Sequence, residues 1–126
     1  MIVSEDLIGL IGAVILTAPY WVSAIMKVYD FTAAALEIMT FGLPFPKMTA
    51  LAVICLQSVG SIFVIAGFHA WLVVAALIVF TALASIKGHG FWRFQGHERL
   101  SHLNACLANL GLSGGLLLAA LVRSQN

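Results

Sequence analysis

The sequence predicts an all-α integral membrane protein: a bundle of four transmembrane helices with a short amphipathic interfacial helix between the first two. Of its 126 residues, 62% are hydrophobic and only 9% are charged, and the mean hydropathy is +1.07. A soluble domain carries about 25% charged residues. The four long apolar runs lack period-2 alternation, so helices are expected, because a helix satisfies its own backbone hydrogen bonds in lipid.

A single domain of residues 1–126 is predicted, with little sequence outside the apolar runs. Each run is long enough to cross a hydrocarbon core of about 30 Å. Only residues 67–70 separate the second run from the third, so these two helices are expected to be antiparallel neighbours. The predicted transmembrane helices cover about residues 7–26, 48–68, 70–86 and 103–122.

The pattern changes after the first run. Apolar residues from Val28 to Ile38 recur at helical spacing on one face, and Asp30 and Glu37 lie on another. The Gly-Leu-Pro sequence at residues 42–44 then ends the pattern. This spacing favours a short amphipathic helix in the membrane interface over a plain polar loop.

The basic residues indicate an orientation. Five of the six lysines and arginines lie in or beside the first and third connections, which share one side of the membrane, and only Arg123 lies on the other. Cytoplasmic segments carry the excess of positive charge, so both termini are predicted outside. Basic side chains at this level are also expected to contact lipid headgroups, a role that we assign to Lys27, Lys87, Arg93 and Arg99.

Polar side chains within the apolar runs are the first candidates for ligand contacts, because an unpaired polar group is costly in lipid. Gln57 lies near the middle of the second run, and Asn109 lies in the fourth. Either amide can bond a ligand such as a quinone carbonyl. The alternative is a structural hydrogen bond between helices, worth about 0.6 kcal/mol on average.

The third connection gathers His89, Trp92, His97 and His102. The spacing of the histidines matches no zinc pattern, and none lies deep enough in the bundle for haem, so no metal site is predicted. His89 and Trp92 remain candidate contacts of a quinone or of a partner helix.

Small residues mark candidate sites of helix packing. Gly111 and Gly115 form a G-x-x-x-G motif that also contains Gly114, and Gly60 lies in the second run. Such glycines let two helix backbones approach closely. The groove on the last run receives either a helix of the same bundle or one from another subunit.

No catalytic constellation is visible. The chain has no Ser-His-Asp set, no paired carboxylates at membrane depth and no phosphate-binding loop. No catalytic residue is therefore predicted, and the sequence leans away from an enzyme that acts alone. The net charge of +1 excludes a basic surface for nucleic acid.

Four short motifs follow one another along the chain: Ser-Ala-Ile-Met-Lys at 23–27, Gly-Leu-Pro at 42–44, His-Gly-Phe-Trp at 89–92, and Asn109 followed by Gly114 and Gly115. In this order they resemble the DoxX-like family of small four-helix membrane proteins of bacteria and archaea. The resemblance covers nearly the whole chain and implies a multi-pass protein of the cytoplasmic (inner) membrane.

The family takes its name from the small subunit of a thiosulfate:quinone oxidoreductase associated with a terminal oxidase. Other members are linked to membrane complexes that handle oxidative stress. The resemblance thus implies a membrane subunit near quinone redox chemistry. The chain departs from it at Gln57, which stands where family members often carry a glutamate, and a glutamine cannot ionise.

The leading hypothesis is an accessory or anchoring subunit of a quinone-linked redox or respiratory membrane complex. Its partners would be other membrane subunits or further copies of itself. The alternatives are a quinone-pocket-forming subunit of a membrane oxidoreductase and a small oligomeric permease. No resident cofactor is predicted, and a quinone or a lipid is the candidate bound molecule.

Overall fold

The computed structural model describes residues 2–124, which form five α-helices and one short 3₁₀ helix, with no strand in this range. Four segments are long and apolar enough to cross a membrane, namely 7–29, 46–66, 70–93 and 96–123. The predicted fold class is therefore confirmed, including the short apolar helix between the first two spans. The elements are α1 (Ile2–Tyr29), α2 (Phe31–Thr40), α3 (Pro46–Ala66), α4 (Ala70–Gly88), η1 (Phe91–Arg93) and α5 (Gly96–Ser124).

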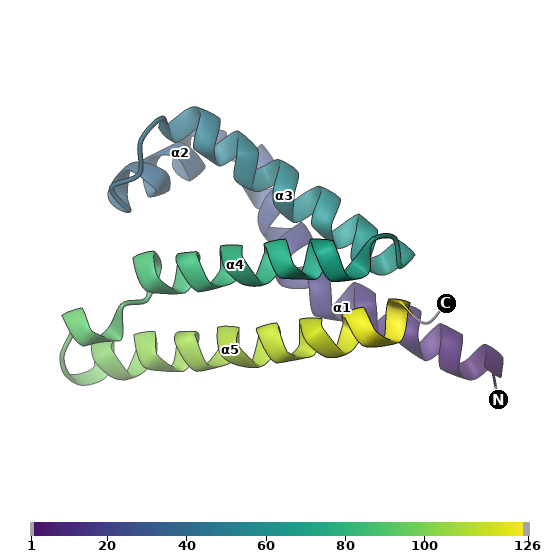
Figure 1. The fold of residues 1–126 in the computed structure, drawn as a ribbon. Coiled ribbons are helices and arrows are strands. Elements are labelled where there is room, and N and C mark those ends of the chain that lie inside the picture. Colours follow the sequence, from purple (N-terminus) through teal and green to yellow (C-terminus); the bar gives the residue numbers. More distant parts are fainter. Residues whose placement is uncertain (1, 125–126) are drawn as a thin grey trace.

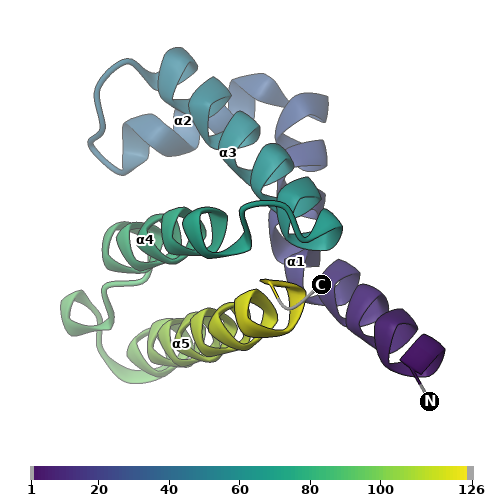
Figure 2. The same cartoon turned by 45° about the vertical axis from the view of Figure 1, so that its right-hand side comes forward.

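The long helices form two crossed pairs (Figures 1 and 2). Helices α4 and α5 run antiparallel side by side, and α3 packs mainly against α1. The start of α1 and the end of α5 lie at one end of the bundle, together with the α3–α4 turn. Helix α2 and η1 lie at the opposite end. This is the arrangement that four membrane crossings require.

The main core lies where α1, α3, α4 and α5 meet. It is built around fully buried Val64, Leu77 and Leu116, and α1 contributes Ala13 and Tyr20. Gly60 of α3 lets α4 come close, because a methyl group at this position would lie 3.0 Å from the Leu77 Cδ2 atom. The hydrophobic effect does not drive helix association in lipid. Small residues at such crossings stabilise the association instead, because they allow close van der Waals packing.

A second, separate core holds α2 against the start of α3. It consists of Ala34, Ile38 and Ala50, with Phe31 and Leu43 packed at its edge. Helix α2 packs mainly against α3 and, to a smaller extent, against α1. Its N-terminus is capped by Asp30, whose Oδ1 atom accepts a hydrogen bond from the Ala33 amide at 3.1 Å.

Two helices are longer than the apolar runs predict. α1 continues through Lys27 to Tyr29, and α5 begins at Gly96, ahead of the expected start near residue 103. The 29 residues of α5 span about 43 Å, which exceeds a hydrocarbon core of about 30 Å. The apolar run marks the part of a helix that lies in hydrocarbon, whereas the helix itself extends into the headgroup region.

Candidate functional site

The Lys27 side chain turns into the bundle near the end of α1. Its ammonium group donates hydrogen bonds to the Ser23 hydroxyl, one turn earlier on the same helix, and to the Gln57 Oε1 atom of α3 at 3.4 Å. Gln57 is only 4% exposed. The i, i+4 spacing of Ser23 and Lys27 places both on one helical face, so the lysine is aimed across the α1–α3 contact at Gln57.

An apolar cavity of about 280 Å³ opens beside this lysine, between α2, α3 and α4. Its volume is close to the lower limit of about 300 Å³ for small-molecule pockets, so it suits one ring or headgroup with a tail left in the lipid. We call it the Lys27 cavity. It is lined by Lys27, Glu37, Ile38, Phe41, Leu43, Thr49, Val53, Phe80, Leu83, Ala84 and Lys87.

The charges of the Lys27 cavity lie among apolar walls. Lys27 and Lys87 contribute two positive charges, and Glu37 contributes one negative charge. Both hydrogen-bond acceptors of Lys27 are neutral, and no carboxylate in the described part of the chain lies within ion-pair distance of it. The cavity therefore carries a net positive charge.

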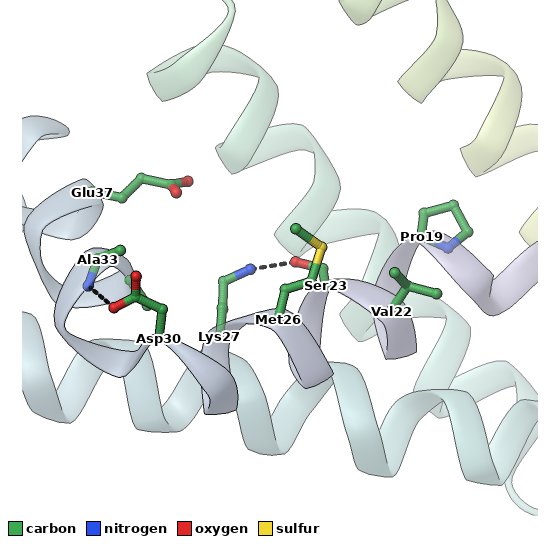
Figure 3. A pocket seen from close by; sticks show the side chains of 9 residues that line it. Pro19, Val22, Ser23, Met26, Lys27, Asp30, Ala33 and Glu37 are labelled. Atoms are coloured by element: carbon green, nitrogen blue, oxygen red, sulfur yellow. Dashed lines mark hydrogen bonds between the residues drawn. The ribbon is translucent and has the colours of Figure 1, made fainter.

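A second pocket, of about 440 Å³, also borders Lys27 and lies between α1 and α2. Figure 3 shows the lysine reaching Ser23 while the Glu37 side chain projects from α2 over the same pocket. Lys27 and Glu37 thus line both hollows. Asp30 also borders this second pocket but is bound to the Ala33 amide as a helix cap.

A different polar cluster joins the far end of α4 to α5. The Nδ1 atoms of His89 and His102 lie 3.0 Å apart, and the Phe94 ring stacks on His102 with its centroid at 4.0 Å. The Cys106 thiol donates to the His89 carbonyl oxygen at 2.9 Å. Between residues 2 and 124, no three histidine, cysteine or acidic side chains are arranged to hold a metal ion.

The four predicted ligand contacts do not converge on one place. Gln57 is buried behind Lys27, which donates to it, and is not part of the cavity lining, whereas His89 belongs to the α4–α5 cluster. The Asn109 amide donates to the Ser85 hydroxyl at 2.8 Å, which ties α5 to α4. Trp92 is exposed on η1. A ligand in the Lys27 cavity would therefore meet none of these four residues directly and would sense Gln57 only through Lys27.

The four predicted headgroup residues differ in their surroundings. Lys87, Arg93 and Arg99 are exposed, whereas Lys27 is half-buried. Arg93 donates to the Lys87 carbonyl oxygen at 2.9 Å and so caps the end of α4. Arg99 lies over the Phe91 ring, 6.0 Å from its centre.

The predicted packing glycines also separate into two kinds. A methyl group at Gly60 would meet Leu77, and one at Gly115 would lie 3.0 Å from the Leu16 Cδ1 atom of α1. Gly111 and Gly114 have no atom within 4 Å of such a methyl group. These two glycines therefore make no close approach within the described chain.

Sequence reasoning did not find Glu37, Lys87 and Phe80 as neighbours in one cavity. Glu37 was visible as part of the polar face of the short helix, and Lys87 as a basic residue in the third connection. Their proximity depends on how α2 folds back across α3 toward α4, for which the local sequence carries no signal.

The fold and the site together define a multi-pass membrane protein with an amphipathic, positively charged cavity between its helices. The DoxX family model matches residues 9–90, from α1 to the residue before η1, and the chain belongs to this family. Helix α5 lies beyond the matched segment. No curated protein and no solved structure matches the chain significantly.

Proposed function

We propose that this DoxX-family protein is an accessory membrane subunit of a quinone-linked redox or respiratory complex, and that its Lys27 cavity binds the quinone headgroup. The observation that carries the proposal is the half-buried Lys27 ammonium in the wall of an apolar cavity of about 280 Å³.

The chemistry of a quinone suits this cavity. A quinone has carbonyl oxygens that accept hydrogen bonds and a ring and tail that prefer apolar surroundings. Lys27 has three N–H donors and uses two of them on Ser23 and Gln57, which leaves one for a ligand. Ile38, Val53 and Phe80 supply the apolar walls.

An accessory role agrees with the absence of other reactive groups at this cavity. Its lining contains no cysteine or histidine, and Glu37 is its sole carboxylate. Electrons would then come from a redox centre on another subunit. This chain would hold the quinone and anchor that subunit in the bilayer.

The proposal is tested by purifying the tagged chain from its native membrane in mild detergent. Bound proteins are identified by mass spectrometry, and the extract is analysed for quinone. We expect a stoichiometric redox partner and bound quinone. A homo-oligomer that carries neither would refute the proposal.

The cavity itself is tested with Lys27→Met, which keeps most of the side-chain volume and removes the charge and the donors. We expect this variant to retain its partner and to lose most of its quinone. Lys47→Met is the matched control, because Lys47 lies at the start of α3 outside the Lys27 cavity. Equal quinone content in the two variants would remove the Lys27 cavity from the proposal.

A further inference from the structure

We infer that the Lys27 cavity selects an anionic headgroup over a neutral one, and that Gln57 determines this preference. The inference rests on the proposed function, since it names the charge of the molecule that the cavity would hold. It follows from how the Lys27 ammonium is bound and from which charges surround it.

Lys27 is fixed in position without being neutralised. Ser23 and Gln57 orient its ammonium group, yet both are uncharged acceptors. An apolar environment strengthens the interaction of such a charge with a ligand, because the effective dielectric constant is far below that of water. The cation is thus held in place for a negative charge that the protein does not itself supply within ion-pair distance.

Glu37 does not replace this missing partner. It lines the Lys27 cavity from α2 and attracts the lysine electrostatically, but its exposed side chain stays beyond ion-pair distance of Lys27. Lys87 adds a second positive charge from the α4 wall. Two cations therefore face one carboxylate, and an anionic headgroup would balance the charge of the cavity.

Gln57 controls this balance because its Oε1 atom occupies the position from which a carboxylate would neutralise Lys27. A glutamate there would form a buried ion pair with the lysine and remove the reason for an anion to bind. A leucine there would remove the hydrogen bond but leave the charge. The charge of residue 57, more than its shape, is thus expected to set the ligand preference.

The test uses the full chain in nanodiscs of zwitterionic lipid and two naphthoquinones with the same alkyl tail. One carries an ionised hydroxyl group beside a carbonyl, and the other carries a methyl group there. Binding is measured by calorimetry, with empty nanodiscs subtracted. We expect wild type to bind the anionic compound at least about tenfold more tightly than the neutral one, the effect of one modest charge interaction.

The variants then separate charge from shape. Gln57→Glu is expected to lose the preference and still bind the neutral compound, whereas Gln57→Leu is expected to keep the preference. Equal binding of the two compounds by wild type, or a preference that survives in Gln57→Glu, would overturn the inference and leave the proposed function standing. Binding of neither compound would overturn both.

An anionic phospholipid offers the same chemistry as an anionic quinone. Adding phosphatidylglycerol to the nanodiscs distinguishes the two sources. Unchanged affinity for the ionised naphthoquinone supports a quinone site. Displacement by the lipid supports the selection of an anionic headgroup and assigns the cavity to the lipid.

Discussion

Replacement of Gly60 with alanine tests the closest contact between α3 and α4. The added methyl group would lie 3.0, 3.2 and 3.3 Å from the Cδ2, Cγ and Cδ1 atoms of Leu77. Carbon atoms prefer separations of about 3.5–4.0 Å, so three atoms of one side chain would be too close. Leu77 is 0% exposed, so it is enclosed by other side chains and cannot turn toward the surface without repacking them.

Such overpacking costs about 1–3 kcal/mol. Alanine also favours a helix over glycine by about 1 kcal/mol, which offsets part of this cost. Gly111→Ala is the matched control, because it brings the same gain in helix propensity and its methyl group meets no atom within 4 Å. The difference between the two variants thus isolates the contact with Leu77.

The measurement is the free energy of unfolding when SDS is titrated into mild detergent micelles, followed by tryptophan fluorescence. We expect Gly60→Ala to be less stable than Gly111→Ala by about 1–3 kcal/mol. A difference smaller than about 0.5 kcal/mol, the usual range for substitutions without contacts, would refute the reasoning. It would mean that α3 and α4 are not packed through Gly60.

Three further predictions concern other contacts and the orientation. Arg123→Ala is expected to lower the free energy of unfolding by about 1–2 kcal/mol in the same titration, because Arg123 donates to the Val64 and Ile65 carbonyl oxygens at the end of α3; Arg99→Ala is the control, and an equal loss there would contradict this role. Tyr20→Phe is expected to lower the free energy of unfolding by only about 0.6 kcal/mol. The variant loses the 2.6 Å bond from the Tyr20 hydroxyl to Thr81, but Thr81 still donates to the Leu77 carbonyl oxygen. A double-mutant cycle with Thr81→Val that shows no coupling would count against this bond. A reporter that is active only outside the cytoplasm should be active when it is fused to either terminus. A cytoplasmic location of either terminus would overturn the orientation drawn from the basic residues.

The fold class was predictable from the sequence because bilayer thickness imposes a direct requirement on the length of an apolar run. The short helix α2 was predictable because its apolar positions recur with helical spacing. The ends of α1 and α5 were harder to predict from the sequence. A helix can continue beyond the hydrocarbon through polar residues such as His97 and Glu98 without any break in the backbone.

The surroundings of Lys27 could not be predicted in the same way. Position in the chain gives the depth of a residue in the membrane, whereas its neighbours depend on the rotation of the helix and on which helix packs beside it. The sequence placed Lys27 at a helix end among lipid headgroups, and the structure turns it toward Gln57, which lies thirty residues further along. The glycines illustrate the same limit, because Gly60 and Gly111 look alike in sequence but only Gly60 faces a neighbour.

The separate core of α2 has a consequence for how a molecule reaches the Lys27 cavity. The small core that packs this helix on α3 consists of Ala34, Ile38 and Ala50 with two residues at its edge, and it shares no residue with the main core. We therefore expect α2 to open locally while α1, α3, α4 and α5 stay folded. Its amide protons should exchange with solvent well before those of α3 and α4, and the access route to the cavity would then be set by the stability of one ten-residue helix.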